Sequence, residues 1–197
     1  MNYLAHILLS GNNPDVMIGN FIADSIKGSK YSSYPLQIQK GIILHRQIDT
    51  TTDAHSAFRQ STKRLHKNYG HYSGIIVDIF YDHFLAKNWG DYSNIPLADY
   101  IKTFYKLLRD NFEILPENIQ KMAPVMMEGN WLLIYAELEG IDRVLAGMNR
   151  RTKNRSGMDN AGQELKEFYT LFEADFRLVM KDLKALSSDF LANYKIN

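Results

Sequence analysis

Apolar residues return every three or four positions along most of the chain, which is the spacing of one face of an α-helix. No segment shows the sustained alternation of apolar and polar residues that predicts a strand. The clearest stripe lies near the C-terminus and consists of Leu165, Phe168, Phe172, Phe176, Val179, Leu183, Leu186 and Phe190. This stripe predicts one long helix over about 159–193.

Proline, glycine and capping residues divide the rest of the chain into further helices. Asn13, Pro14 and Asp15 form a helix start, in which asparagine caps the helix and proline takes its first position. We expect this helix to run to Lys27 and to end at Gly28. Others are expected from near Pro35, over about 54–69, over 75–89, from 94–96 to Pro116, around Pro124, and over 131–148 with a break near Gly140. The sequence therefore predicts an all-α fold, a helical bundle formed as a single domain by residues 1–197.

Composition indicates a globular protein and excludes some chemistry. Of the 197 residues 45% are hydrophobic, so the chain can form a sizeable core. The net charge of +1 argues neither for nor against an anionic partner. The absence of cysteine excludes disulfides, cysteine-ligated zinc and thiolate nucleophiles. The N-terminal apolar run has no basic lead-in and is interrupted by His6, and no segment is long enough to span a bilayer. We therefore expect a cytoplasmic protein without a membrane partner.

The segment IIVDIFYDHFLAKNW, residues 75–89, sets charged residues into an almost continuous apolar run. In a helix Asp78 and Asp82 lie one turn apart on the same face, and His83 lies about 100° round from Asp82. Burying a carboxylate without a partner is costly, so these acids need a compensating charge or hydrogen bonds.

Polar residues interrupt apolar faces in three other places. His6 lies within YLAHILL, Asp24 lies within FIADSI, and His45 and Asp49 lie one turn apart on an otherwise apolar helix face. Several carboxylates in one interior prevent each other from ionising, and a divalent cation held between facing helices resolves the conflict. We therefore predict a metal site from His6, Asp24, His45, Asp49, Asp78 and Asp82.

The ligand types limit the metal and the reaction. Carboxylates with one or two imidazoles and no sulfur favour Mn²⁺ or Mg²⁺ over Fe²⁺ or Zn²⁺. Such a cation holds phosphoryl oxygens and lowers the pKa of bound water, so we expect hydrolysis of a phosphate ester. Structural roles stay open: His6 as a hydrogen-bonded core residue, Asp24 paired with Lys27 or Arg46, and Asp78 and Asp82 in separate salt bridges.

Other residues are candidates for supporting roles. Arg46 could stabilise charge on a phosphoryl oxygen or pair with Asp49 or Asp53, and Asp49 could act as general base. His55 or His83 could protonate the leaving oxygen. The basic residues that could receive an acidic partner are Lys63, Arg64, Arg150 and Arg151. Aromatic residues are not interleaved with them, which disfavours nucleic acid.

Five motifs occur in a characteristic order over residues 1–151: MNYLAH, GNFIAD, GIILHRQID, DIFYDHFLAKNW and WLLIYAELEGIDRVLAGMNRR. In these motifs the chain resembles the acyl carrier protein phosphodiesterases, unusual members of the HD phosphohydrolase group. The family motif falls on His6, Asp24, His45, Arg46, Asp49, Asp78, Asp82 and His83. Ordinary HD enzymes carry adjacent His-Asp, whereas this chain has only the reversed pair Asp82-His83.

The resemblance implies a distorted HD-type helical fold and a role in fatty acid biosynthesis. The implied reaction is hydrolysis of 4′-phosphopantetheine from a serine of holo-acyl carrier protein, with Mn²⁺ or Mg²⁺ required. Two other functions stay open, which are hydrolysis of a nucleotide or small phosphate ester and a non-catalytic helical module. In that module the buried acids would pair with Arg46, Lys27 and Arg143. The oligomeric state is not predicted.

Overall fold

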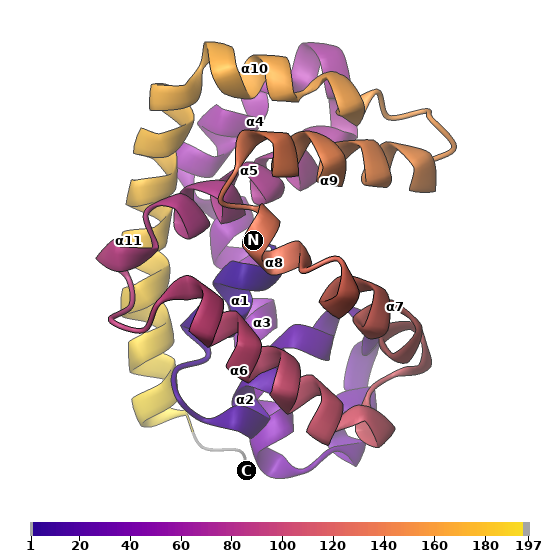
Figure 1. Ribbon diagram of the computed structural model, residues 1–197. Coiled ribbons are helices and arrows are strands. Elements are labelled where there is room, and N and C mark those ends of the chain that lie inside the picture. The colour runs from indigo at the N-terminus through magenta and orange to yellow at the C-terminus, as the bar shows by residue number, and fades with distance from the viewer. Residues whose placement is uncertain (1, 195–197) are drawn as a thin grey trace.

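The computed structural model describes residues 2–194, which form a layered arrangement of helices (Figure 1). This part of the chain contains eleven α-helices, six short 3₁₀ helices and no strand, which confirms the predicted all-α class. Within it, none of the helices has the length and apolar character needed to cross a membrane. The α-helices are α1 (Tyr3–Leu9), α2 (Pro14–Ile22), α3 (Leu36–Ala54), α4 (Ser56–Tyr69), α5 (Ser73–Lys87), α6 (Leu97–Asp110), α7 (Glu117–Glu128), α8 (Trp131–Ile134), α9 (Leu138–Arg151), α10 (Gly162–Glu167) and α11 (Tyr169–Asn193).

Two glycines let α2 and α3 cross in backbone contact. A Cβ atom at Gly19 would lie 2.0 Å from the carbonyl oxygen of Ile38, and one at Gly41 would lie 2.1 Å from that of Val16. No larger residue fits at either position unless a helix moves. Because the helices are so close, the end of α2 and the 3₁₀ helix η1 (Ala23–Ser25) lie against the middle of α3.

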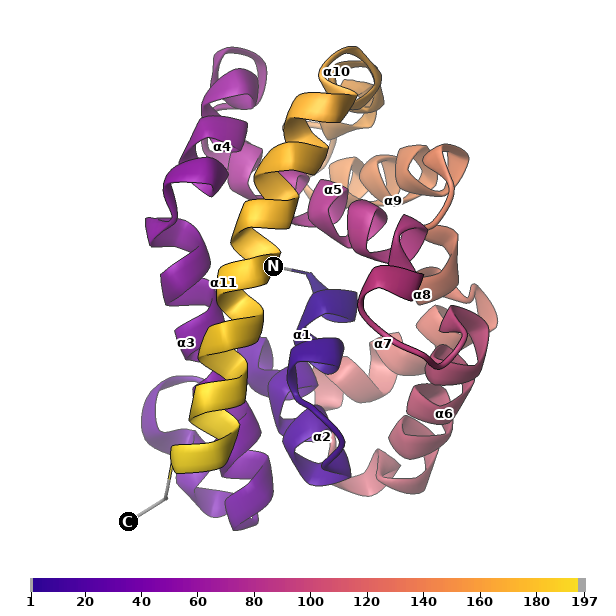
Figure 2. The same ribbon diagram turned by 90° about the vertical axis from the view of Figure 1, so that its left-hand side faces the viewer.

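The fully buried carboxylate of Asp82 fixes α1 on α5. Its two oxygens accept hydrogen bonds from the backbone N–H groups of Leu4 and Ala5, at 2.8 and 3.1 Å. These groups belong to the first turn of α1, where N–H groups have no partner within the helix. A carboxylate placed there also complements the helix dipole. As a result, α1 lies deep in the molecule, close to α3, α5 and α11 (Figure 2).

The C-terminal helix is shorter than the sequence predicts. The range of about 159–193 is divided at Phe168, whose φ of −108° and ψ of 26° interrupt the helical backbone. On one side α10 packs against α9, and on the other α11 continues along α3, α4 and α5. Phe168 contacts Phe172 across the break. The apolar residues therefore keep their spacing of three and four positions through the break. For this reason the sequence pattern could not show that the helix is divided at Phe168.

Two other predicted boundaries differ from the structure. The helix that begins at Pro14 ends at Ile22 and not at Lys27, because the chain continues in η1 and in the 3₁₀ helix η2 (Gly28–Ser33). The break within 131–148 lies between α8 and α9, whereas Gly140 is inside α9. A Cβ atom at Gly140 would lie 1.8 Å from the carbonyl oxygen of Ile134. This glycine therefore allows close packing of α8 and α9.

Candidate metal centre

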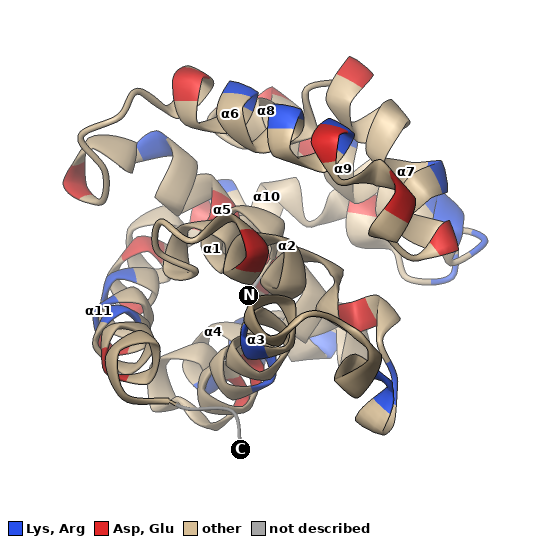
Figure 3. Cartoon of the chain, turned by 90° about the horizontal axis from the view of Figure 1, so that it is seen from below, with Lys and Arg blue, Asp and Glu red and all other residues tan. Residues whose placement is uncertain are grey.

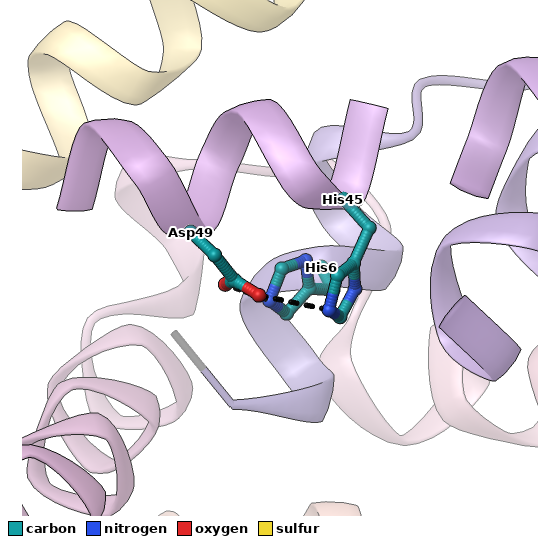
Figure 4. A group of neighbouring side chains, drawn as sticks. All are labelled: His6, His45 and Asp49. Atoms are coloured by element: carbon teal, nitrogen blue, oxygen red, sulfur yellow. Dashed lines mark ion pairs between the residues drawn. The ribbon is translucent and has the colours of Figure 1, made fainter. Parts of the chain in front are cut away.

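His6 from α1 and His45 and Asp49 from α3 point toward one another in the interior (Figure 4). Nε2 of His6 lies 3.1 Å from Oδ1 of Asp49, and Nε2 of His45 lies 2.9 Å from Oδ2. Both histidines are buried, whereas the Asp49 side chain is 37% exposed. The carboxylate therefore bridges two buried imidazoles and also reaches the molecular surface.

Asn20 of α2, which the sequence analysis missed, orients both imidazoles. Its side-chain amide nitrogen donates to the backbone oxygen of His6 and to Oγ of Ser10, at 2.9 Å each, so its Oδ1 is directed at the histidines. Nδ1 of His6 donates to this Oδ1 at 2.8 Å. Nδ1 of His45 donates to the backbone oxygen of Asn20 at 2.9 Å. Because each Nδ1 donates a hydrogen bond to Asn20, Nε2 is the ring atom that faces the carboxylate, and its lone pair is directed there when the ring is neutral.

The sequence carried a signal for Asn20 in the motif GNFIAD. This motif places Asn20 one helical turn before Asp24, within an apolar frame. A polar residue that is fully buried in such a frame must have hydrogen-bond partners, so the frame marks Asn20 as a candidate site residue in the same way as the acids.

Electrostatic interactions give the two histidines opposite pKa shifts. Burial and the adjacent charge of His45 lower the pKa of His6 to about 4. Burial also lowers the pKa of His45, but hydrogen bonds to Asp24 and Asp49 outweigh it and raise that pKa to about 9. Burial raises the pKa of Asp49, and its interactions with both imidazoles shift it well below the ordinary range. In the metal-free protein the centre therefore holds one imidazolium and an ionised carboxylate at neutral pH.

Asp24 completes the group at its solvent-facing edge. Its Oδ1 lies 3.1 Å from Nε2 of His45, and its side chain is 76% exposed. The hydrogen bond to His45 lowers the pKa of Asp24, so this carboxylate is ionised at neutral pH. The same residue lines a pocket of about 300 Å³ between η1, α7 and α9. Asp24 thus connects the buried imidazoles to a space that a ligand can enter.

The distances and atom types in this group fit a divalent cation. Single ligand atoms of His6, His45 and Asp49 all lie within 4.8 Å of one another. Neighbouring ligands bonded at roughly 2.1 Å in an octahedral shell are separated by roughly 3 Å, which matches the observed 2.9 and 3.1 Å. Two imidazole nitrogens with carboxylate oxygens form a donor set that can hold a divalent metal ion.

Asp78 and Asp82, which the sequence groups with these ligands, have different surroundings. Both oxygens of Asp82 face the first turn of α1, as described above. Burial raises the pKa of Asp82 to about 7, although these backbone hydrogen bonds oppose the shift. Burial also raises the pKa of Asp78, and the negative charges of Asp49 and Asp53 raise it further. Asp78 therefore lies within electrostatic range of the centre, whereas Asp82 supports the helix that carries His6.

The two histidines predicted as proton donors lie in other environments. Nδ1 of His83 donates to the backbone oxygen of Tyr135 at 2.7 Å, and its Nε2 lies 2.8 Å from the hydroxyl of Tyr169. His55 caps α4, where its Nδ1 accepts from the N–H of Ala57, and its Nε2 lies 3.3 Å from Asp182. The structure brings neither ring together with His6 and His45.

Arg46 lies beside His45 in sequence but is directed to the segment after η1. Its guanidinium donates to the backbone oxygens of Ile26 and Gly28, at 3.0 and 2.8 Å. It also lies over the ring of Tyr31, 5.1 Å from the centroid. These contacts hold the chain that follows Asp24, while a role at a phosphoryl oxygen stays a prediction.

The four basic residues predicted to bind an acidic partner fall into two groups. Lys63 and Arg64 lie on α4, where Arg64 forms an ion pair with the buried Asp175 of α11. Arg150 and Arg151 lie exposed at the end of α9, and Arg151 lines the pocket that contains Asp24. Of these four residues, only Arg151 is thus placed at the pocket that contains Asp24.

Comparisons with known proteins give a consistent result. A family model described as acyl carrier protein phosphodiesterase matches residues 1–183. The acyl carrier protein phosphodiesterase of Photorhabdus laumondii is 31% identical over 177 residues, which cover 89% of each chain. That of Yersinia pestis is 33% identical over 155 residues, which cover 78% of this chain and 80% of the relative. No solved structure matched.

Proposed function

This chain belongs to the acyl carrier protein phosphodiesterase family, and from this premise we propose that it hydrolyses a phosphodiester of holo-acyl carrier protein. The bond cleaved joins 4′-phosphopantetheine to a serine of the carrier, and the products are the apo-carrier and free phosphopantetheine. The observation that carries the proposal is the convergence of His6, His45 and Asp49 in a chain of this family. A buried group with strongly shifted pKa values beside a pocket is typical of a catalytic site.

The proposed cofactor is Mn²⁺ or Mg²⁺, held by His6, His45 and Asp49, with Asp24 as a further donor. Support comes from the orientation of both Nε2 atoms and from the separations of about 3 Å between donor atoms. A divalent cation bound there would neutralise charge on the phosphoryl oxygens and lower the pKa of a water molecule.

The chain's own residues prepare the site for this reaction. Asn20 holds both imidazoles with Nε2 facing the carboxylates, so neither ring has to rotate on binding and only the Nε2 proton of His45 has to leave. Asp49 joins the two rings, and Asp24 presents an ionised carboxylate at the pocket. Arg46 fixes the backbone that follows Asp24, which keeps this carboxylate near His45.

The proposed partner surface is the basic end of α9 and the loop that follows it (Figure 3). Arg150, Arg151, Lys153 and Arg155 are exposed there. The side chain of Asn149 holds the loop, because its Oδ1 accepts from Ser156 and Gly157 and its Nδ2 donates to Asp159. An ordered positive surface next to the pocket suits an acidic carrier protein.

The proposal is tested with protein stripped by a chelator and then reloaded with Mn²⁺ or Mg²⁺. Holo-carrier protein is incubated with each sample, and conversion to apo-carrier is followed by intact-protein mass spectrometry. We expect conversion only after reloading, together with release of 4′-phosphopantetheine. A nucleotide panel is assayed in parallel, and turnover of nucleotides alone would overturn the carrier reaction. Protein that binds neither metal and loses no stability in chelator would support a non-catalytic module instead.

A further inference from the structure

The pocket beside Asp24 has a size and a position that suit a flexible ligand. Its volume of about 300 Å³ lies at the lower end of the range for small-molecule sites, roughly 300–1,000 Å³. It is lined by Tyr3, Phe21, Asp24, Ser25, Asn118, Ile119, Met122 and Arg151. Because Asp24 also contacts His45, one end of the pocket adjoins the candidate metal centre.

The wall of the pocket combines apolar and hydrogen-bonding groups. Phe21 and Ile119 are buried, and Met122 is partly buried. The sulfur of Met122 accepts a hydrogen bond from the hydroxyl of Tyr3 at 3.5 Å. Elsewhere in the lining, Nδ2 of Asn118 donates to Oγ of Ser25 at 2.7 Å, which joins α7 to η1. A ligand with alkyl groups and amides could pack on the first set and exchange hydrogen bonds with the second.

Charge is arranged along the pocket as well. Besides burial, the negative charge of Asp24 raises the pKa of Tyr3, and the positive charge of Arg151 lowers it. Tyr3 therefore lies within electrostatic range of both groups. The guanidinium of Arg151 packs over the ring of Trp131, 5.8 Å from the centroid, which positions it at the pocket. It also continues the basic surface of Arg150 and Lys153 into the pocket.

We propose that this pocket binds the pantetheine arm of the substrate, with its phosphate end at Asp24 and its thiol end toward Ile119 and Met122. The inference rests on the proposed function and adds the residues that would recognise this substrate. A pantetheine arm carries a dimethyl group, two amides and a terminal thiol, which match the apolar wall and the polar pair of Asn118 and Ser25. Cleavage requires the phosphate end to lie near the metal centre, and Asp24 joins the two, because it lines the pocket and lies 3.1 Å from Nε2 of His45.

The test fills the pocket without touching the centre. Met122→Trp places a large ring in the pocket, while Val125→Trp places the same ring on an exposed position of the same helix and is the matched control. Binding of free pantetheine to metal-free protein is measured by titration calorimetry, and hydrolysis of holo-carrier and of bis(p-nitrophenyl) phosphate is measured after reloading with Mn²⁺. For Met122→Trp we expect at least about tenfold weaker pantetheine binding and a similar loss of kcat/KM on the carrier. For Val125→Trp, pantetheine binding and the rates on both substrates should stay within about twofold of the unmodified protein, since this side chain is exposed and does not line the pocket.

A second variant covers the case in which Met122→Trp does not fold. Asn118→Ala changes an exposed residue and should also weaken pantetheine binding, by about fivefold for one lost hydrogen bond. Unchanged pantetheine binding in a folded Met122→Trp, or in Asn118→Ala if the first variant is unfolded, would overturn the pocket assignment. Failure of the proposed function has a different signature, because the unmodified protein would then leave holo-carrier intact whatever the binding data show.

Discussion

The rings of His6 and His45 stack with centroids 3.9 Å apart and planes inclined by 17°. The residues come from α1 and α3, so this contact joins two helices at the point where their polar groups meet. Two protonated imidazoles at that distance would repel each other, and the opposite pKa shifts of the pair avoid this. The parallel rings also present their Nε2 atoms along the same edge, where Asp49 lies.

Replacement of the bridging carboxylate tests the centre directly. Asp49→Asn keeps the size of the side chain but removes its negative charge, which both imidazoles contact. We expect Mn²⁺ to bind at least about 100-fold more weakly and turnover of holo-carrier to fall by a similar factor. Metal content by elemental analysis and initial rates measure the two effects.

Asp53→Asn is the matched control for this prediction. Asp53 is the exposed acid one turn further along α3, and its replacement should leave metal content and turnover unchanged. If Asp49→Asn retained both its metal and its activity, the centre would have to be placed elsewhere.

Asn20 is predicted to act through the histidines that it orients. In Asn20→Ala, Nδ1 of His6 loses its acceptor, so the Nε2 lone pair is no longer held toward Asp49. We expect about 10–100-fold weaker Mn²⁺ affinity, as is usual for the loss of a residue that orients metal ligands. Calorimetric titration of Mn²⁺ measures it.

Asn149→Ala is a suitable comparison, because Asn149 is also a buried, hydrogen-bonded asparagine but holds the 152–159 loop. It should lose stability and keep its Mn²⁺ affinity. Equal Mn²⁺ affinity in the two variants would mean that Asn20 has only a structural role.

Periodicity predicted most of the fold but not the direction of each buried polar side chain. The apolar spacing indicated nearly all the helices, and the one-turn spacing of His45 and Asp49 placed both on one face of α3. Asp82 occupies an equally apolar frame, yet its carboxylate faces the N-terminus of α1. Which helix end meets a buried acid depends on tertiary packing, and local spacing carries no information about it. For the same reason His83 could not be separated from the histidines of the centre.

Asp82→Asn should distinguish a supporting role from a ligand role. An amide in place of the carboxylate accepts one backbone N–H and turns its own NH₂ group toward the other, so a buried donor loses its partner. We expect a loss of about 2–3 kcal/mol in the free energy of unfolding, measured with urea, and Mn²⁺ binding in the folded protein within about threefold of normal. A variant of normal stability that had lost its metal would instead indicate a ligand.

The crossing of α2 and α3 predicts a strong effect of a single methyl group. In Gly41→Ala the new Cβ would lie 2.1 Å from the backbone oxygen of Val16, which only a shift of one helix can relieve. We expect the free energy of unfolding to fall by about 3 kcal/mol or more, with weaker metal binding because Asn20 moves with α2. Gly74→Ala is the control, since nothing lies within 4 Å of its Cβ and alanine favours a helix by up to about 1 kcal/mol. Equal stability of the two variants would contradict the observed crossing.

The stability of the metal-free protein and the stabilisation added by metal should depend on pH in opposite directions. In metal-free protein the folded pKa of His45 is about 9, above the unfolded value of 6.5, so protonation favours the folded state. This contribution is complete below pH 6.5 and is lost as the pH rises through 9, with an upper value of about 3 kcal/mol.

Urea unfolding in chelator between pH 6.5 and 9 measures this decline, which should be absent in His45→Gln. Metal binding displaces the proton from His45, so the stabilisation that Mn²⁺ adds should grow over the same range. If the stabilisation added by Mn²⁺ became smaller as the pH rises, His45 would not be a ligand. A ligand that must lose its proton to bind the cation makes metal binding stronger at higher pH.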